Sequence, residues 1–535
     1  MKCLEKDRAR RYETATGLAT DVQRHLTNET VTARPPSKCY RFEKLVRRNR
    51  IAFAGAGVFA LVLVVLALFA VQAHRATQAR FAERRQNAID KTLLTAWSGD
   101  LDGAEQSIRN AEAAGVSVGE LRMLRGSVSM HRGNYGEAVK ELEQAWKLSR
   151  NSVAVCSMLI QSYLLLGQSD KAQPLFTTLE QLKPATPEDF LFRGVLHLFV
   201  DPAVALETLN EAVRRRPTGV ALMQRGSARA GIAQDTAQMD DAEAAIADVN
   251  GAKAMLPPNA EVTALSLRAH LIAAEIYEER HLAEKRANAL RQVEADARAL
   301  ERYPGNQAAI LARTMYLKHL GNDPVRLREL RATATNNVTD YFLAVALYRQ
   351  GDWQAALEVV PPDAKRGNAG PDYMRGYVLA EFPDGPQLAG KEIQRLLDLN
   401  PATRDTMALQ LTLRLLGRKG EAMSVCRNAR ERAAPAPPWR REWYRRLLDY
   451  NCGDLSEGEL LKAAGASRYN QCEAHFFIGM TKLAERDRSA AREHFRASIA
   501  TRVFTYYDYD WSQAFLTRME KDPLWPPWIP PKPEP

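Results

Sequence analysis

The sequence predicts an all-α protein in which a single transmembrane helix is followed by an α-solenoid of helical hairpins. Three observations lead to this fold class. An apolar run without a charged residue covers residues 51–72, Ala-rich segments with helical periodicity follow it, and turn residues recur at a regular interval. A chain of 535 residues is also longer than one hydrophobic core usually serves, which agrees with a repeat array.

On this basis the chain divides into eight segments. These are the end of a folded domain (1–30), a basic juxtamembrane linker (31–50), the apolar helix (51–72), a helical connector (73–118), regular repeats (119–258), degenerate repeats (259–470), a last repeat with a capping helix (471–520) and a Pro/Trp-rich tail (521–535). The tail has too many prolines for a helix. We therefore expect an extended strap, in which Trp525 and Trp528 pack on the last helices or form a small docking patch.

The apolar run has the properties of a membrane span. Its 22 residues would extend about 33 Å as a helix, which matches a bilayer core of about 30 Å. A buried core helix is the alternative, but soluble helices seldom run this long without a polar face. Gly55 to Ala60 also fit the loose dinucleotide-binding pattern G-x-G-x-x-A. Because no strand precedes them, we interpret them as small residues of a membrane helix.

Basic residues are concentrated before this run. The formal net charge is +10, and residues 1–50 alone hold 13 Lys and Arg against 6 Asp and Glu. Such a distribution is typical of a cytoplasmic juxtamembrane stretch, which indicates that the N-terminus lies in the cytoplasm. No basic stripe with interleaved aromatic residues stands out elsewhere, so the sequence predicts no nucleic-acid binding.

The N-terminal segment MKCLEKDRARRYETA carries a motif of the form L-x-K-D-x-x-x-R-Y. Its matching residues are Leu4, Lys6, Asp7, Arg11 and Tyr12. The motif resembles the last characteristic segment of bacterial serine/threonine protein kinase domains, although Arg8 stands where that family usually has proline. In the family, the arginine aligned with Arg11 pairs with the glutamate of an A-P-E motif, because a buried arginine cannot lose its charge. This sequence has no A-P-E motif, so that partner is missing.

The residues after the motif resemble the corresponding part of membrane-anchored bacterial kinases with extracytoplasmic repeats. An amphipathic helix is predicted with Leu18, Val22 and Leu26 on one face, and in the family this face packs on the kinase domain. The Pro35-Pro36 pair then forms a stiff connection. The resemblance implies the cytoplasmic (inner) membrane, with the N-terminus inside and the repeats outside. Because no evident part of the chain covers the apolar face, we expect the N-terminal segment to be poorly ordered or to bind a lipid surface or a partner.

The catalytic motifs of a kinase are absent from the sequence. Phosphoryl transfer needs a phosphate-binding loop, a strand lysine, a catalytic aspartate and a magnesium-binding aspartate, yet no V-A-I-K, H-R-D-x-x-x-x-N or D-F-G motif occurs. The sequence therefore predicts no enzyme and no cofactor in this chain. ATP and magnesium are expected only if the chain is the regulatory half of a receptor-type kinase whose catalytic domain lies upstream. This alternative stays open. A further alternative is that the chain is a scaffold of an envelope assembly that is unrelated to signalling.

The repeat period is clearest in residues 119–258. One unit begins at Gly119, and the next begin at Val153 and Pro187, each 34 residues later. The order of small and large residues resembles the tetratricopeptide repeat, in which small residues let two antiparallel helices approach and large residues fill the gap. In the first unit these residues are Gly126, Gly133, Tyr135, Ala138, Leu142 and Ala145, and Gly167 has a corresponding position in the second.

Later units are less regular. A fourth unit contains Gly226 and is expected to have a longer turn between its helices, around Gln234 to Asp240. Residues 260–303 predict two long helices, and residues 508–519 predict a helix that closes the open end of the stack. Further units are marked by Gly351, Gly417 and Gly479.

Stacked hairpins form a concave groove that is lined by the first helix of each unit. Polar residues on those helices are the candidate groove residues, and grooves of this kind take a protein or peptide segment. The alternative for each residue is a merely solvated surface position. The candidates are Arg122, Arg125, Ser129, Gln161, Arg193, His197, Gln224 and Arg225.

Two short motifs match patterns of catalytic sites but lack the necessary context. Residues 115–119 fit G-x-S-x-G, yet no strand precedes the serine, so we predict a turn between helices. Residues 385–391 have the spacing of a phosphate loop, but Glu392 stands where Ser or Thr should hold magnesium. The nine histidines form no pair at metal-binding spacing, so we predict no metal site.

Six cysteines are scattered along the chain without a C-x-x-C pair. Cys426, Cys452 and Cys472 lie within one stretch, in an oxidising compartment if the predicted topology holds. A disulfide among them is one interpretation, and free buried thiols are the favoured one.

Overall fold

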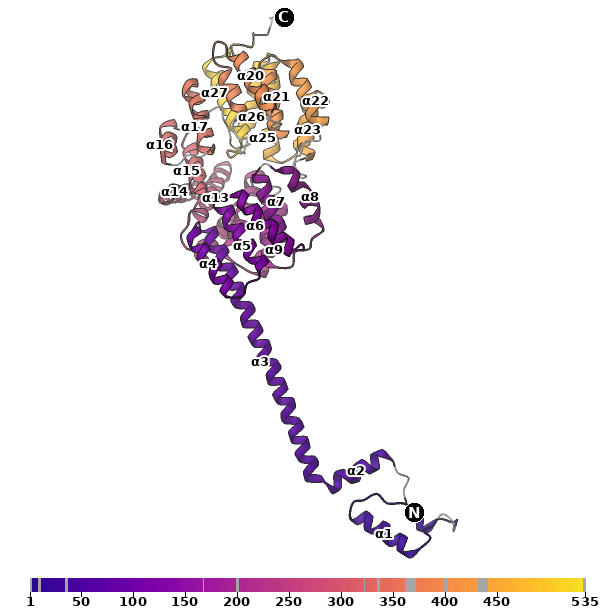
Figure 1. Ribbon diagram of the computed structural model, residues 1–535. Helices are drawn as coiled ribbons and strands as arrows, with labels where there is room; N and C mark the ends of the chain where they lie inside the picture. Colours follow the sequence, from indigo (N-terminus) through magenta and orange to yellow (C-terminus); the bar gives the residue numbers. More distant parts are fainter. Residues whose placement is uncertain are drawn as a thin grey trace. The chain divides into compact units, whose positions relative to one another are not determined.

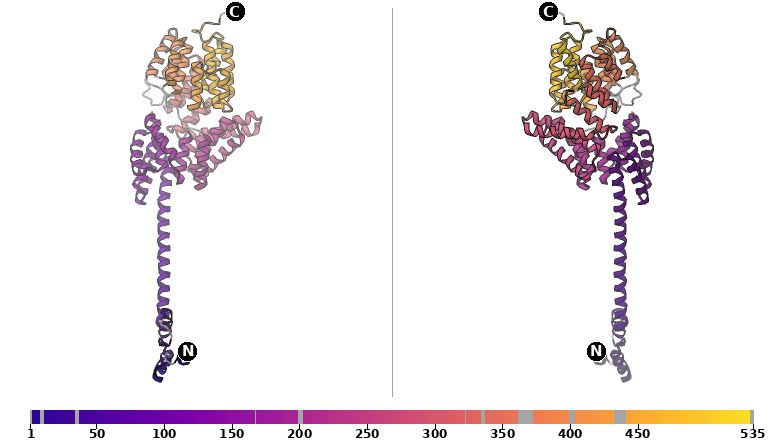
Figure 2. Two further views of the ribbon diagram at one scale, coloured as in Figure 1. Left: turned by 90° about the vertical axis from the view of Figure 1, so that its right-hand side faces the viewer. Right: turned by 90° about the vertical axis from the view of Figure 1, so that its left-hand side faces the viewer.

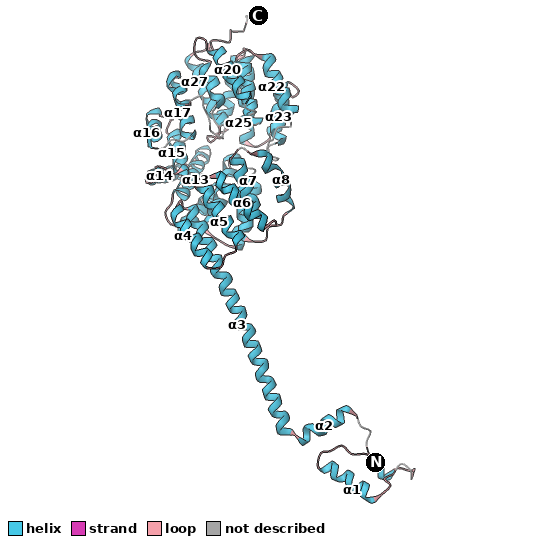
Figure 3. Ribbon diagram, in the orientation of Figure 1, coloured by secondary structure: helices cyan, strands magenta, loops and turns pink. Residues whose placement is uncertain are grey.

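The computed structural model describes residues 2–7, 11–33, 37–166, 168–198, 202–321, 323–333, 337–360, 372–398, 403–431 and 441–532. Within these ranges every regular element is a helix, which confirms the predicted all-α class (Figure 3). The chain forms two compact units, Met1–Gln86 and Asn87–Pro535. Three features of the sequence patterns, namely Arg8, Gly167 and the Pro35-Pro36 pair, lie outside the described residues.

The first unit contains two short helices and most of a long one. Its elements are a 3-10 turn (Lys2–Leu4), α1 (Ala15–Leu26), α2 (Lys38–Arg48) and α3 (Arg50–Trp97), whose last turns belong to the second unit (Figure 1). Among the described residues α3 is the one helix long and apolar enough to cross a membrane, judged by length and composition. None of its most apolar window is buried.

Asp21 organises the contacts of α1. Its buried carboxylate accepts hydrogen bonds from the Tyr12 hydroxyl (2.6 Å), from the Thr32 backbone N–H and hydroxyl (both 2.8 Å) and from the Ala33 N–H (2.9 Å). Burial favours the neutral acid, but these bonds outweigh it and hold the pKa of Asp21 below its usual range. The same hydrogen bond to Asp21 raises the pKa of Tyr12 to about 12. The short N-terminal segment is therefore tied to α1 by polar contacts.

The apolar face of α1 is exposed. The helix begins at a Thr14 cap, whose hydroxyl accepts from the Gly17 N–H at 3.1 Å. Leu18, Val22 and Leu26 are 38%, 50% and 75% exposed, so no described part of the chain covers the stripe that the sequence identified. The expected disorder or binding of this segment stays a prediction.

In the described part of the second unit twenty-four helices follow α3, and most of them pair as antiparallel hairpins. They are α4 (Leu101–Ala113), α5 (Val118–His131), α6 (Tyr135–Leu148), α7 (Val153–Leu165), α8 (Ser169–Gln181), α9 (Pro187–Leu198), α10 (Pro202–Arg215), α11 (Gly219–Thr236), α12 (Met239–Met255), α13 (Ala260–Glu279), α14 (Ala283–Leu300), α15 (Gln307–His319), α16 (Pro324–Thr333), α17 (Asn337–Gln350), α18 (Trp353–Val359), α19 (Asp372–Leu379), α20 (Gly385–Asp398), α21 (Thr403–Leu415), α22 (Lys419–Glu431), α23 (Arg441–Cys452), α24 (Glu457–Ala464), α25 (Arg468–Ala484), α26 (Arg488–Ala500) and α27 (Tyr507–Lys521).

The hairpins follow the predicted repeat spacing. The first helices α7 and α9 begin at Val153 and Pro187, the two residues at which repeat units were expected to start. Close packing within a hairpin explains the small residues. A Cβ atom at Gly126 would lie 2.6 Å from Leu142 Cγ on the paired helix, so only glycine permits this approach. The predicted closing helix is also present as α27.

The fourth repeat differs from the prediction. A longer turn was expected around Gln234 to Asp240, but α11 continues to Thr236 and α12 already begins at Met239. The extra residues lengthen both helices instead, because the additional turn of α11 is well buried, with Ala233 and Gln234 at 0% and 4% exposure. Burial therefore makes the insertion helical rather than a loop.

The C-terminal tail packs on the last helices. Of its two predicted arrangements, packing is therefore confirmed and a separate docking patch is not. Trp525 is fully buried, and the Trp528 indole donates to the Leu415 carbonyl at 3.1 Å. The Arg488 guanidinium holds the strap by donating to backbone carbonyls. The acceptors are the carbonyls of Leu524 (2.8 Å), Trp525 (3.1 Å), Pro526 (3.2 Å) and Ile529 (2.5 Å).

Free buried thiols were the favoured interpretation of Cys426, Cys452 and Cys472, and this interpretation is wrong for the first two. Cys426 of α22 and Cys452 of α23 form a disulfide, whereas Cys472 is free and buried. Antiparallel packing of the two helices brings the paired Cα atoms within 5.9 Å, which their sequence separation of 26 residues does not reveal.

Candidate functional site: a central cavity in the repeat array

A cavity of about 990 Å³ lies on the inner side of the first repeats. First helices of successive hairpins supply most of its lining, namely α5, α7, α9, α11, α13 and α15. Trp97 at the end of α3, Trp443 of α23 and the start of α25 complete it. Its volume is at the upper end of the range of about 300–1,000 Å³ that is usual for ligand-binding clefts.

The wall combines apolar and neutral polar side chains. Methionine, leucine, valine and phenylalanine side chains form the apolar part, and the amides of Gln161, Gln224 and Asn470 add hydrogen-bonding groups. Charge is sparse, because the charged side chains of the lining are Asp235, Glu261 and Arg268. Burial raises the pKa of Glu261, whose carboxylate accepts from the Asn306 amide at 3.3 Å. The cavity therefore suits a ligand with little net charge.

Three polar atoms in this wall are buried without a hydrogen-bond partner among the described residues. They are Trp97 Nε1, Ser127 Oγ and Arg268 Nε. Ser127 is 1% exposed, so its hydroxyl has no access to bulk water. Buried donors without a partner are rare in folded proteins because each loses its hydration. These three atoms therefore lie beneath the cavity surface, and the half-buried side-chain amides of Gln161 and Asn470 are polar groups that a ligand can reach.

His131 lies beside this group. Its Nδ1–H donates to the Ser127 carbonyl at 2.8 Å, because a carbonyl only accepts, which leaves Nε2 as an acceptor. Its ring packs edge-on against Trp97 with centroids 4.6 Å apart. Burial lowers the pKa of His131, so the ring is neutral at physiological pH.

The predicted groove residues occupy different places. Gln161 and Gln224 line the cavity, whereas Ser129 and His197 lie on α5 and α9 outside its lining. The four arginines are engaged elsewhere. Arg122 pairs with Glu141 (2.9 Å), Arg125 with Glu112 (3.8 Å) and Arg225 with Asp248 (2.5 Å), and Arg193 donates to the Leu182 carbonyl (3.3 Å). A role for these residues in ligand binding stays a prediction.

Sequence reasoning missed part of the wall for two reasons. On α5 the inward face carries Ser127, Met130 and His131. The predicted groove residues of this helix, Arg122, Arg125 and Ser129, lie on a different face. The sequence signal for this face is an apolar stripe at helical spacing, but such a stripe is equally typical of a helix face buried in a hydrophobic core. Trp443 and Tyr469 come from helices more than 200 residues further along the chain, so no local pattern connects them with α5.

Contacts between α11 and the start of α25 join distant parts of the array. Asp235 Oδ1 accepts from the Ser467 hydroxyl (2.9 Å) and from the Tyr469 backbone N–H (3.1 Å). The Tyr469 hydroxyl in turn donates to Gln234 Oε1 at 2.9 Å. Asp235 thus satisfies one of the unpaired N–H groups at the N-terminus of α25, where the helix dipole also favours a carboxylate.

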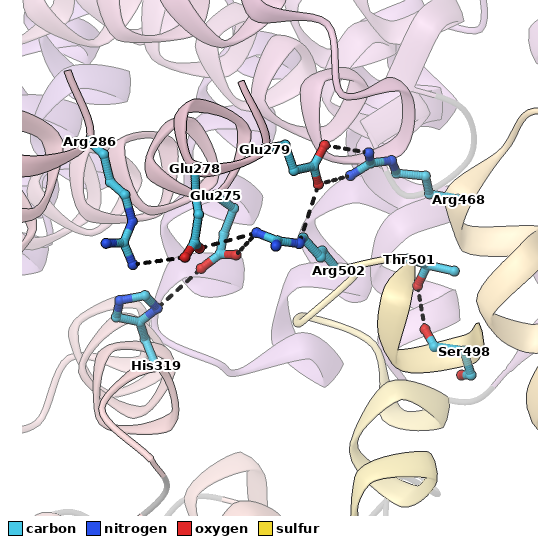
Figure 4. A network of polar contacts seen from close by, with 9 residues as sticks. All are labelled: Glu275, Glu278, Glu279, Arg286, His319, Arg468, Ser498, Thr501 and Arg502. Carbon is cyan, nitrogen blue, oxygen red and sulfur yellow. Dashed lines mark hydrogen bonds and ion pairs between the residues drawn. The ribbon is translucent and has the colours of Figure 1, made fainter. Parts of the chain in front are cut away.

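A second set of contacts joins α13 to the α25–α26 hairpin (Figure 4). Arg468 binds Glu279 through two hydrogen bonds, at 3.0 and 2.8 Å. Arg502, after α26, reaches Glu275 (3.3 Å), Glu278 (3.1 Å) and Glu279 (3.6 Å). Figure 4 also shows Arg286 and His319, which approach the same glutamates at 3.5 and 3.4 Å. We call these residues together the α13 cluster.

The residues that match the kinase motif lie in the first unit, apart from this cavity in sequence. Leu4 is 71% exposed and Asp7 is exposed. Arg11 is exposed as well, and its Nε donates to the Glu5 carbonyl at 2.6 Å. Tyr12 binds Asp21 as described above.

The other short motifs have structural roles. Ser117 of the G-x-S-x-G match caps α5 in the turn after α4, with Glu120 completing a capping box, as the turn prediction requires. The match at residues 385–391 forms the first turns of α20 rather than a loop. In the described part of the chain no group of three His, Cys, Asp or Glu residues is placed to hold a metal ion.

Comparison with known proteins identifies the repeat. Two segments match the tetratricopeptide repeat family, residues 129–191 and residues 337–360, so the chain contains tetratricopeptide repeats. No curated protein matches the sequence. Three solved structures resemble the chain in part. A human IFIT1 dimer with PPP-AAAA is 14% identical, and the match covers 72% of this chain and 90% of that chain, with a TM-score of 0.33. The P58(IPK) TPR domain is 15% identical, and the match covers 76% of this chain and 99% of that chain, with a TM-score of 0.17. The structure of Naa15/Naa10 bound to HypK-THB is 11% identical, and the match covers 83% of this chain and 81% of that chain, with a TM-score of 0.20.

Proposed function

We propose that this chain is a membrane-tethered interaction module whose central cavity holds a segment of a partner protein. The observation that carries the proposal is the cavity itself, with an apolar wall, few charges and half-buried side-chain amides that a ligand can reach. Tetratricopeptide repeats support the same function, because stacked helical hairpins present concave surfaces for protein segments. A peptide segment offers apolar side chains for the wall and backbone groups for the amides of Gln161 and Asn470.

Site-specific photo-crosslinking tests this function. A photoreactive residue is placed at Gln161 or Gln224 in the cavity, and at Lys140 as the control, because that side chain is 72% exposed on the second helix of its hairpin. We expect one protein adduct from both cavity positions and none from the control. A peptide derived from that adduct should bind with an affinity that falls by about tenfold in a Gln161→Ala/Gln224→Ala variant. Equal adducts at all three positions would contradict the proposal.

The proposed tether is α3, which would cross the cytoplasmic membrane with the N-terminus inside and the repeats outside. Three observations support this topology. The apolar window is unburied, basic residues precede it, and the disulfide of the described residues lies after it, together with the buried free thiols of Cys156 and Cys472. The exposed thiols Cys3 and Cys39 precede the span, whereas the Cys426–Cys452 disulfide follows it, and disulfides form in oxidising compartments.

Thiol labelling in intact cells tests the topology. We expect a membrane-impermeant maleimide to label a Lys140→Cys variant in intact cells, and to label Cys39 only after permeabilisation. Labelling of Cys39 in intact cells, or recovery of the chain in the soluble fraction, would reject the tether.

A second candidate function follows from the exposed face of α1. Leu18, Val22 and Leu26 form an unpaired apolar stripe, and the kinase resemblance supplies a domain that would cover it. The chain would then be the regulatory half of a serine/threonine protein kinase. An immunoblot of source membranes with an antibody against residues 120–500 separates the two candidates. A band near 59.8 kDa supports the module alone, and a band heavier by a kinase domain supports the second.

A further inference from the structure

Repeats in a simple solenoid contact only their neighbours, which leaves the concave groove open along one side. Here hydrogen bonds connect α11 and α13 to the α25–α26 region over sequence separations of 189 to 271 residues. We propose that these contacts form a latch that closes the array around the central cavity, so that an occupant enters by its end unless the latch opens. This inference rests on the proposed function of the cavity and adds how access to it is controlled.

The latch and the cavity share residues. Asp235, Ser467 and Tyr469 form the contact between α11 and α25, and all three also line the cavity. Asn470 and Trp443 contribute to the same side of the wall. Movement of α25 away from α11 would therefore remove one wall of the cavity, and the lining would become an open groove.

The chemistry of the latch permits opening without unfolding. Its charged members are partly exposed, with Arg468 and Glu279 at 26% and 22% and Arg502 and Glu278 at 35% and 42%, whereas Gln234 is buried. Ion pairs with this exposure are screened by salt and contribute little individually. By contrast, the pair Lys318–Asp510, which joins α15 to α27, is almost completely buried. The buried pair supplies a stable pivot, while the α13 cluster supplies contacts that exchange with water.

Closure also restricts the kind of occupant. An α-helix with a diameter of about 10–12 Å would fill 990 Å³ in about two turns, so a long helix does not fit inside the closed array. A short extended segment at a chain end fits the volume and presents its backbone to the amides of Gln161 and Asn470. The latch thus admits a segment through the end of the cavity and excludes one that would have to enter from the side until it opens.

Cysteine accessibility tests the latch without any ligand. The reporter is Gln161→Cys in the full chain, with Cys3 and Cys39 replaced by serine because they are exposed. Iodoacetamide measures access of a small molecule, and a maleimide carried on a polyethylene glycol chain measures access of a large one. We expect rapid reaction with the first and slow reaction with the second.

Variants on the two sides of the latch should change the reaction rate of the large reagent and leave that of the small reagent unchanged. Arg468→Glu replaces the contact with Glu279 by repulsion between two carboxylates and should raise the rate of the maleimide reaction severalfold. Arg468→Lys keeps a positive charge beside Glu279 and should therefore react more slowly with the maleimide than Arg468→Glu does. A cross-link between Asp235→Cys and Ser467→Cys, whose side-chain oxygens lie 2.9 Å apart, should make the reaction slower still.

Matched controls decide the outcome. A Lys140→Cys reporter on the outer face should react equally fast with both reagents in every variant, and far-UV circular dichroism should be unchanged by Arg468→Glu. If the large reagent labels Gln161→Cys at the control rate in the cross-linked protein, the latch does not bound the cavity and the inference fails. Because no peptide is used, this result is independent of whether the cavity binds a partner.

Discussion

The two halves of the repeat array use the same hairpin for different purposes. From α4 to α15 the apolar residues form three successive clusters, and the inner face stays open as a cavity. From α16 to the tail a single cluster runs from Leu327 to Ile529, and α27 packs on the first helices α17 and α25. Figure 2 shows this second group, in orange and yellow, beside the purple helices of the first. A repeat array therefore becomes either a groove or a core, depending on whether a further segment fills its inner face.

Side-chain size follows this division. The eight largest fully buried side chains among the described residues are aromatic, and all lie in the C-terminal half. Trp511, Phe515 and Trp525 pack there with ring centroids 5.4 and 5.3 Å apart. In the N-terminal half the helices approach through alanine and glycine, which brings the backbones close, and the buried aromatic residues there, such as Tyr163 and Phe192, keep 6% and 4% exposure. The contrast suggests that damage to one half should leave the other folded.

The largest expected effect comes from the tail. Trp525→Ala removes a fully buried side chain from the C-terminal cluster and should lower the free energy of unfolding of that half by about 3–5 kcal/mol. Leu524→Ala is the control, because the neighbouring side chain is 63% exposed and should have little effect. Urea unfolding followed by amide exchange resolves the two halves. Equal loss of protection in α5 to α9 would break the comparison, since it would mean that both halves unfold as one.

Reduction of the Cys426–Cys452 disulfide should have the next largest effect. The bond closes a loop of 26 residues, and a loop of this size contributes about 2–4 kcal/mol. Cys452→Ser, or a reductant, should lower the unfolding midpoint of the C-terminal half alone. An unchanged midpoint of the oxidised and reduced protein would show that the bond does not constrain this half.

Glycine substitutions test close packing in the N-terminal half. Gly126→Ala places a methyl group 2.6 Å from Leu142 Cγ and should cost about 1–3 kcal/mol. Gly136→Ala on the paired helix meets no atom within 4 Å and should stabilise by about 0.5–1 kcal/mol through helix propensity. Thermal unfolding of both variants measures the difference. If the two substitutions behave alike, close approach of the helices is not what requires glycine here.

The smallest effect concerns the boundary between the halves and depends on pH. Burial favours neutral Glu275, but its contacts with His319, Arg502 and Arg286 outweigh this and hold its pKa below the usual value of 4.5. Its stabilising contribution is therefore complete above pH 4.5 and is lost as the pH falls through the lower pKa of the folded state. Amide exchange of α13 and α25 should accelerate in that range, and Glu275→Gln should remove the response. Glu294→Gln, on the outer surface of α14, is the control and should leave it unchanged.

The sequence by itself determined the features that depend on local spacing. The period of 34 residues located the starts of α7 and α9, and the alternation of small and large residues assigned Gly126 and Leu142 to a close-packed hairpin. Such features are readable because neighbouring helices pair through residues at fixed separations. The context of the short motifs likewise predicted that Ser117 lies in a turn and not at a catalytic elbow.

Only the tertiary structure decided the features that join distant parts of the chain. The Asp235–Ser467 contact, the α13 cluster, the disulfide and the packing of Trp525 connect elements that no local pattern relates. The inward face of α5 was also beyond the sequence, since an apolar stripe looks the same whether it lines a cavity or a core. The physical reason is that periodicity specifies which face of a helix is buried, whereas the curvature of the whole array specifies what that face meets.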